Sequence, residues 1–330
     1  MSDVNLPHVD GSWSLADWWG AVMVRCKYGR DHYRVEPGLY RSGSPTADSP
    51  VLVTSNYKLT FDLLRSDVAH IDTWILALET HGINVWCAAG KGTFSTDELV
   101  RRIGIVELPR HVTHRTVILP QLGASGIAAH EVTRQIGFRV VYGPVRSRDI
   151  PAFLAADMKA TPPMREVTFD LGERLLVTPV ELIGALPHIA TLFVALIIAS
   201  VLRGIPLPPL LRRYWLPSSS AVVVGCIGMP ALFPLLPSRA FALKGWFLGM
   251  VTTLLFVAKF AGNFCVSVGH LLLQPCIAAY YSLNYTGASP IASESGVKHE
   301  IARYVPPMKV LAALGLVFLG YDFLQNEKRN

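Results

Sequence analysis

Charged residues are scarce in this 330-residue chain, at 16% against about 25% in an average soluble domain, whereas hydrophobic residues make up 51%. This composition argues against a wholly water-soluble protein, and the apolar runs after Pro179 indicate a membrane. The net charge of +6 does not indicate nucleic acid, because Lys and Arg are scattered among acids in the first half and stand at segment ends in the second. A membrane surface is the better interpretation.

Cysteines are also few, and no two of them form a CxxC pair: Cys26, Cys87, Cys226, Cys265 and Cys276. Their spacing argues against a zinc site, an iron–sulfur site and a disulfide framework. The first residues contain no basic region followed by an apolar core, so we expect no cleaved signal peptide. The first domain is therefore expected in the cytoplasm.

The first half of the chain alternates between short apolar runs and segments of helical period. Strands are predicted at 50–55, 83–88, 117–120 and 139–144. A loop at 56–60 leads into a short helix, and further helices are predicted at 68–80, from the capping-box pair Ser95 and Glu98 onward, at 126–137, and as a capped helix at 147–158. This alternation predicts an α/β fold with a Rossmann-like, parallel, doubly wound sheet.

Ligands of such sheets bind at the carboxyl ends of the strands, here the loops 54–60, 87–94, 122–126 and 143–148. Threonine and serine side chains in these loops can bind a ligand or only stabilise a turn. The glycines can let a ligand approach closely or can simply be turn residues. The candidate contacts are Thr54, Thr60, Gly123, Ser125, Gly126 and Gly143.

The second half predicts an α-helical transmembrane domain of about five spans, at 179–202, 215–236, 241–258, 262–283 and 308–324. The domain organisation follows: an N-terminal segment, 1–48, that packs on the soluble domain; the α/β domain, 49–165; a linker, 166–178; and the transmembrane domain, 179–330. We expect the inner membrane, with the soluble domain on the cytoplasmic side. The polar stretch 284–300 is expected as a long loop.

Gly90-Lys91-Gly92 invites a nucleotide-binding interpretation, which its neighbours exclude. A Walker A loop needs glycine where Val85 stands and Ser or Thr where Gly92 stands. A GxGxxG fingerprint fails at Ser95. Cys87 lies beside Lys91 in this glycine-bearing turn. A cysteine taken alone is more often a buried core thiol, but this position favours a thiolate. The two interpretations are therefore about equally weighted.

The segment Asn84-Val-Trp-Cys-Ala-Ala-Gly-Lys91 resembles the N(V/I)WCA(A/G)GK motif of the mercury-methylating corrinoid proteins, the HgcA family. Residues 50–62 are similar to the corrinoid domain of the large subunit of the corrinoid iron–sulfur protein. The resemblance implies a cobalamin-type corrinoid with Cys87 as the lower axial ligand of cobalt. It further implies cofactor contacts from the whole motif: Asn84, Val85, Trp86, Cys87, Ala88, Ala89, Gly90 and Lys91. It places the motif on a helix, whereas the apolar pattern predicts a strand.

The resemblance implies transfer of a methyl group from cobalt to inorganic Hg(II), forming methylmercury. It implies a ferredoxin-type [4Fe–4S] electron donor, similar to HgcB, and a methyl-folate donor acting through a methyltransferase. Two alternatives stay open: a membrane corrinoid methyl carrier of one-carbon metabolism, and a non-enzymatic corrinoid-binding or transport protein. Cys226, Cys265 and Cys276, in the predicted spans, are more simply packing residues than mercury carriers.

Overall fold

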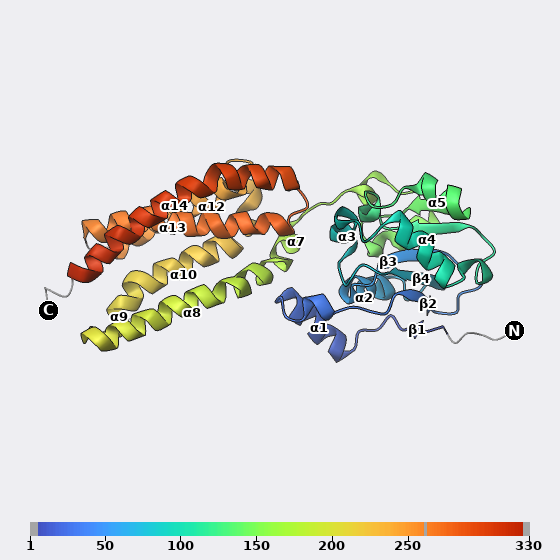
Figure 1. Cartoon of the computed structure of the whole chain (residues 1–330), viewed down its shortest axis with the longest axis horizontal. Coiled ribbons are helices and arrows are strands. Elements are labelled where there is room, and N and C mark those ends of the chain that lie inside the picture. The colour runs from blue at the N-terminus through green and yellow to red at the C-terminus, as the bar shows by residue number, and fades with distance from the viewer. Residues whose placement is uncertain (1–5, 261–262, 326–330) are drawn as a thin grey trace. The chain divides into compact units, whose positions relative to one another are not determined.

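The computed structural model describes residues 6–260 and 263–325. The first five residues of the predicted segment 1–48, the last five of the predicted domain 179–330, and Gly262, the predicted first residue of the fourth span, lie outside the described residues. The chain divides into two compact units, Met1–Val24 with Tyr28–Val167 and Arg25–Lys27 with Thr168–Asn330. Figure 1 draws the sheet of the first unit and the helices of the second.

The described residues of the first unit form a six-stranded sheet in the order β1-β2-β4-β3-β5-β6. Strands β4, β3, β5 and β6 are parallel to one another, but β2 runs antiparallel to β4. The predicted parallel arrangement is confirmed for β3, β5 and β6, whereas the antiparallel strand β2 makes the whole sheet mixed. The strands are β1 (His8–Val9), β2 (Gly38–Ser42), β3 (Val51–Ser55), β4 (Thr73–Leu78), β5 (Thr116–Leu119) and β6 (Arg139–Tyr142).

Helices cover both faces of this sheet, as in a doubly wound fold. Val51 and Val53 of β3 face the core formed with α3 (Val85–Lys91), α4 (Thr96–Ile105) and α5 (Ala129–Ile136). Leu52, between them, faces α2 (Lys58–Asp67) and α6 (Ile150–Ala155) on the other side. Helix α1 (Leu15–Arg25) precedes β2, and the short 3-10 turns are η1 (Arg30–His32), η2 (Leu108–Arg110), η3 (Gln121–Gly123), η4 (Ser147–Asp149) and η5 (Pro162–Arg165).

The direction in which strands are added reverses between β3 and β5. The chain passes from β3 outward to β4, then returns across β3 to reach β5 on its other side. Such a switch point opens a crevice outside the carboxyl ends of the strands, where ligands of α/β folds bind. Three of the predicted ligand loops, 54–60, 122–126 and 143–148, lie at the carboxyl ends of the parallel strands β3, β5 and β6, so this topology brings them to the same edge of the sheet. The predicted loop 87–94 is instead mostly helix, and it comes after β4.

Two neighbouring elements have the opposite type to the predicted one. The predicted helix at 68–80 contains strand β4, whose residues are all buried, because a central strand covered on both faces reads as a continuous apolar run without alternation. The predicted strand at 83–88 is helix α3. Asn84 provides its N-cap and the alanines favour helix, so the pattern-based prediction is wrong and the helix implied by the family resemblance is observed.

Other predicted elements differ at their ends. Strands β3, β5 and β6, helix α5, and the Ser95 cap of α4 are confirmed. Ser147 does not cap the last helix; its hydroxyl donates a hydrogen bond to Asp67 Oδ2 at 2.5 Å, and the segment starts as the 3-10 turn η4. Strands β1 and β2 were not predicted, since both depend on pairing with distant residues.

The described residues of the second unit contain five helical stretches long and apolar enough to cross a membrane, which confirms the predicted number: Leu171–Arg203, Leu207–Leu235, Phe241–Lys259, Phe264–Gly287 and Ser295–Gln325. Figure 1 shows these helices side by side, and α13 contacts α10, α12 and α14. The helices are α7 (Leu171–Leu176), α8 (Thr178–Arg203), α9 (Leu207–Leu210), α10 (Leu216–Val223), α11 (Met229–Leu232), α12 (Phe241–Phe260), α13 (Phe264–Asn284) and α14 (Glu294–Gln325).

The predicted polar loop at 284–300 is partly helical. Helix α14 begins at Glu294, well before the predicted start of the last span at residue 308. Glu300 explains part of this extension, because its carboxylate accepts hydrogen bonds from the backbone N–H groups of Phe241 and Ala242, both at 3.2 Å, at the start of α12. Glu300, a polar residue of α14, thus caps the start of α12 and does not stand in a loop.

Candidate functional site

The turn that leads into helix α3 is held by Asn56, a fully buried residue just after β3. Its side-chain oxygen accepts hydrogen bonds from the N–H groups of Thr80 and Gly82, at 3.0 and 3.1 Å. Its side-chain nitrogen donates to Glu79 Oε1 at 2.9 Å. The carboxyl ends of β3 and β4 are therefore joined by one side chain, which fixes where α3 begins.

Asn84 and Gly92 define the two ends of α3. The Asn84 side chain accepts a hydrogen bond from the backbone N–H of Cys87 at 2.9 Å, as an N-cap does. Gly92 ends the helix in the left-handed conformation, with φ of 77°, which glycine adopts without strain. Cys87 is thus held in the first turn of a short helix with defined ends.

The helical period divides the motif into two faces. Val85, Ala88 and Ala89 are buried in the core of the unit. The opposite face carries four residues that reach the surface: Trp86, which is 37% exposed, the half-buried Cys87, and the exposed Gly90 and Lys91. Cys87 therefore presents its thiol on the side of the helix that the protein core leaves uncovered.

Gly90 has no steric reason within the chain to be a glycine. A Cβ atom added at Gly90 would meet nothing within 4 Å, and the residue has no positive φ. Gly in a helix interior costs about 0.5–1 kcal/mol relative to Ala. The side of α3 at Gly90 is therefore open in the described part of the chain, which leaves room for a ligand to approach the helix.

The predicted glycines at 123 and 126 have a different role. A Cβ at Gly126 would lie 2.1 Å from the carbonyl oxygen of Phe94 and 3.0 Å from Ala89 Cα, and a Cβ at Gly123 would lie 2.5 Å from the Phe94 ring. The loop after β5 therefore packs directly against the inner side of α3 and the residues that follow it. These glycines position the helix that carries Cys87.

The other predicted contacts lie at the same edge but are not brought together. Thr54 is buried within β3, opposite Ala77 of β4, rather than in a loop. Thr60 is half-buried in the first turn of α2, and Ser125 is exposed after η3. Gly143 is buried, with Ile118 Cγ2 3.1 Å from where its Cβ would be, so a side chain there would be in tight contact with β5.

Glu98 of α4 ties its own helix to the end of β4. Its carboxylate accepts hydrogen bonds from the Glu79 N–H at 2.9 Å and from the Arg102 and Arg101 guanidinium groups at 2.8 and 2.5 Å. Burial raises the pKa of Glu98, but these donors together outweigh burial and hold the pKa below its ordinary value. The sequence suggested Glu98 only as part of a capping box and gave no role to Asn56.

The cysteines of the described residues are all free thiols. Within the same ranges, 6–260 and 263–325, no group of three or more His, Cys, Asp or Glu side chains is arranged to hold a metal ion.

Comparison with known proteins gives similarity to one part of the chain. Residues 28–154 match the family model of the CO dehydrogenase/acetyl-CoA synthase delta subunit. The gamma subunit of the acetyl-CoA decarbonylase/synthase complex of Methanosarcina acetivorans is 38% identical over 125 residues, which are 36% of this chain and 26% of that protein. The corresponding subunit of Methanopyrus kandleri is 35% identical over 127 residues, 38% of this chain and 27% of its own length.

The chain thus spans about a quarter of the length of these relatives. The family match includes strands β2 to β6 and helix α3, and so contains the whole candidate site. It ends before the helices of the second unit. The family match therefore lies within the α/β unit.

Proposed function

We propose that the chain is a corrinoid-dependent methyltransferase of the HgcA type, which transfers a methyl group from corrinoid cobalt to Hg(II) and releases methylmercury. The observation that carries the proposal is Cys87, presented with Gly90 on the uncovered face of a capped helix at the carboxyl edge of the sheet. The motif of residues 84–91 and the similarity to acetyl-CoA decarbonylase/synthase gamma subunits support it. The corrinoid-binding domain would be 49–165.

The residues present fit such a cofactor. A corrinoid ring supplies four nitrogen ligands to its cobalt, so one protein donor suffices, and a thiolate is a strong, soft donor for it. Cys87 would be that ligand, and Gly90, whose Cβ position is open, would let a flat ring lie close to the helix. Trp86 and Lys91 would border the ring on the same face.

The remaining residues of the site divide by their packing. Thr60 and Ser125, which reach the surface, are proposed to contact the cofactor directly. We propose supporting roles for the residues enclosed by protein, which hold α3 and its loops in place: Thr54, Val85, Ala88, Ala89, Gly123, Gly126 and Gly143. Asn84 would fix the Cys87 backbone through its cap.

The bound corrinoid would supply the methyl group, carried on cobalt. The Cys87 thiolate would hold the cofactor as a soft, electron-rich donor, and the cofactor would supply a methyl group with carbanion character for a soft electrophile such as Hg(II). Electrons for the next cycle are proposed to come from a ferredoxin-type [4Fe–4S] partner resembling HgcB, and methyl groups from methyl-folate through a methyltransferase. The soluble unit would face the cytoplasm, anchored in the inner membrane by the five spans.

A second candidate is a membrane methyl carrier of one-carbon metabolism. The names of the relatives favour it, since they belong to an acetyl-CoA decarbonylase/synthase complex. The two candidates share the corrinoid and Cys87 but differ in the methyl acceptor. Only the first requires Hg(II).

The test uses the full-length chain in lipid nanodiscs, loaded with methylated corrinoid and then given Hg(II). Methylmercury should form, and Cys87→Ala should abolish it and change the visible spectrum of the corrinoid. Cys26→Ala is the matched control, because Cys26 is also a half-buried free thiol of the described chain but lies outside the site. Simultaneous replacement of Cys226, Cys265 and Cys276 by Ala should leave much of the activity.

Near-normal methylmercury formation by Cys87→Ala would contradict the mechanism. Corrinoid binding with an unchanged spectrum in that variant would count against axial ligation. Methyl transfer to a carbon-metabolism acceptor, with none to Hg(II), would replace the first candidate by the second.

A further inference from the structure

Helix α1 exposes an apolar face to its surroundings, whereas an ordinary surface helix turns its apolar face to the core. Its outward face carries four large apolar residues at helical spacing: Leu15, Trp18, Trp19 and Val22, which are 88%, 59%, 66% and 49% exposed. Ala21 and Val24 on the opposite side are buried. A surface helix normally turns its polar face to water, so this exposed apolar stripe indicates a binding surface.

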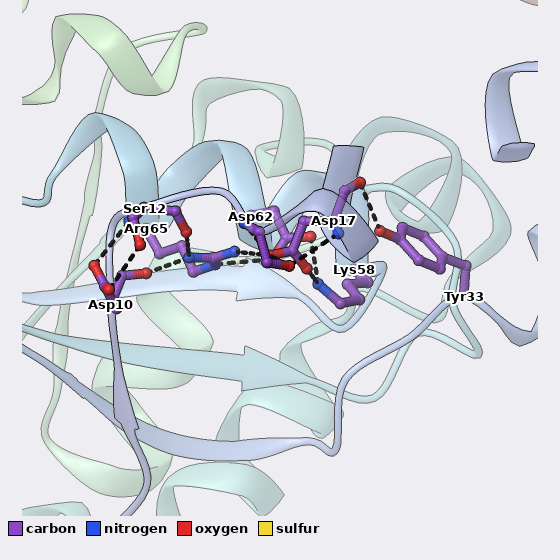
Figure 2. Close-up of polar contacts among 8 residues, drawn as sticks. Asp10, Ser12, Asp17, Tyr33, Lys58, Asp62 and Arg65 are labelled. Atoms are coloured by element: carbon purple, nitrogen blue, oxygen red, sulfur yellow. Dashed lines mark hydrogen bonds and ion pairs between the residues drawn. The ribbon is translucent and has the colours of Figure 1, made fainter. Parts of the chain in front are cut away.

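Asp17, the acidic residue of the helix, points inward and fixes how α1 is rotated about its own axis. Figure 2 shows its carboxylate paired with two cations of α2, Lys58 Nζ at 2.5 Å and Arg65 Nη2 at 3.0 Å. The same two cations bind Asp62 at 2.6 and 2.8 Å. Burial opposes the charge of Asp17, but the hydrogen bonds from Lys58 and Ser14 hold its pKa well below its ordinary value.

Additional contacts prevent α1 from turning its apolar stripe inward. Arg65 also donates to the backbone carbonyl oxygens of Asp10 and Ser12, just before the helix (Figure 2). A Cβ at Gly20 would lie 2.5 Å from the Tyr33 hydroxyl, so the helix is packed closely on its inner side. The outward direction of Trp18 and Trp19 is therefore built into the fold.

The chemistry of the stripe fits a bilayer interface. Trp is the residue most typical of the membrane–water boundary, and interfacial helices combine Trp and Leu on one face with nearby Lys and Arg. The exposed basic residues Lys27 and Arg30 follow the stripe just after the helix. Five candidate spans in the same chain would tether the first unit to a bilayer.

We propose that the outward face of α1 lies in the headgroup region of the membrane and prefers anionic lipid. Leu15, Trp18, Trp19 and Val22 enter the apolar boundary, and the basic end of the helix binds lipid phosphate. This interfacial helix is separate from the spans and from the candidate site on α3. It does not depend on the proposed function.

The experiment measures tryptophan fluorescence of the full-length chain in nanodiscs of phosphatidylcholine and phosphatidylglycerol, made with ordinary or with brominated acyl chains. The double variant Trp18→Phe, Trp19→Phe keeps an apolar face, and its fluorescence is subtracted from that of the unchanged chain. The difference isolates the two tryptophans from the spans, where Trp215 and Trp246 are quenched in both proteins. We expect this difference to be largely lost in brominated lipid.

The matched control is Trp74→Phe, because Trp74 is 6% exposed within the first unit and its contribution should survive bromination. Removing phosphatidylglycerol should weaken the quenching of Trp18 and Trp19. A difference signal that persists in brominated lipid and is quenched by aqueous acrylamide would overturn the proposal, since the face would then be in water. A signal protected from both quenchers would equally overturn it, in favour of a protein partner or a second copy.

Discussion

Replacement of Gly90 by Ala separates the stability of helix α3 from its capacity to bind a cofactor. The substitution adds a single methyl group on the uncovered face, between Trp86 and Cys87 in angular position around the helix. Apart from its two chain neighbours and the backbone of α3 itself, no atom of the described residues lies within 4 Å of that position. Any loss of function from Gly90→Ala must therefore come from something that binds there.

The cofactor-free protein should become slightly more stable. Ala is favoured over Gly in a helix by about 0.5–1 kcal/mol, and Gly90 has an ordinary backbone conformation that Ala adopts without strain. Because α3 has only seven residues and Gly90 is next to its last, we expect the lower end of this range. A gain of this size raises the melting temperature of the first unit by roughly 1–3 °C.

The corrinoid-bound protein should lose affinity. If the ring lies in contact with α3, the added methyl group overlaps it, and overpacking of a fitted contact costs about 1–3 kcal/mol. This corresponds to a dissociation constant larger by roughly 5- to 150-fold. Equilibrium dialysis of the full-length chain against corrinoid, followed by visible absorbance, measures the change directly.

The matched control is Gly104→Ala. Gly104 is also exposed, helical and next to the last residue of its helix, α4, and a Cβ there would meet nothing within 4 Å. It should give a similar small gain in stability with unchanged corrinoid affinity. Unchanged affinity in Gly90→Ala, together with the expected rise in melting temperature, would refute a ring packed on this face. Equal loss of affinity in both variants would show that the effect is not local.

Three further predictions concern the support of α3. Gly126→Ala should destabilise the first unit by about 1–3 kcal/mol, because its Cβ would lie 2.1 Å from the Phe94 carbonyl; thermal unfolding measures this, and an unchanged melting temperature would contradict the packing argument. Asn84→Ala should lower the free energy of unfolding by about 1 kcal/mol and speed hydrogen exchange of the Cys87 amide several-fold, whereas Asn84→Asp should retain the cap. Equal exchange rates in the unchanged protein and both variants would exclude a capping role. Glu98→Gln should destabilise the unit by about 1.5–3 kcal/mol at pH 7, where the carboxylate is fully charged. Since the pKa of Glu98 lies below its ordinary value of 4.5 in the folded state, this contribution is lost as the pH falls through the lowered pKa. Thermal unfolding should therefore show the difference in melting temperature between the two proteins shrinking in acid. A difference that does not depend on pH would contradict this.

The sequence predicted those elements whose signals are local. Strand β3 and the Ser95 cap of α4 follow from short patterns, and the five spans follow from length and hydropathy. Strand β2 could not be predicted in this way, because its antiparallel partner β4 is more than thirty residues away in the sequence. Periodicity carries no information on which strands pair.

The exchange of strand and helix at β4 and α3 has a different origin. Ile71, Trp74, Ile75 and Leu78 happen to lie at helical spacing, but Leu76 and Ala77 between them are equally buried, as in a strand covered on both faces. Cys87 therefore lies in helix α3 after β4 instead of at the end of a predicted strand, and its role as a ligand-binding residue stays a prediction. The roles of Gly123 and Gly126 could not be predicted, because the close approach of two loops is a property of the tertiary structure.

The helical conformation of residues 85–91 places the exposed residues of the motif on one side. In a strand, side chains alternate between two faces, so Cys87 would share a face with Val85 and Ala89 and would point away from Trp86 and Gly90. In the helix, Trp86, Cys87, Gly90 and Lys91 lie on one side, while Val85, Ala88 and Ala89 enter the core. The alanines are small because the loop at Gly126 packs against them, and the glycine is small where the protein leaves open space. Small residues on the two sides of α3 therefore have different roles. The alanines on the buried side set the position of the helix, and Gly90 on the exposed side leaves room for the ligand that Cys87 would bind.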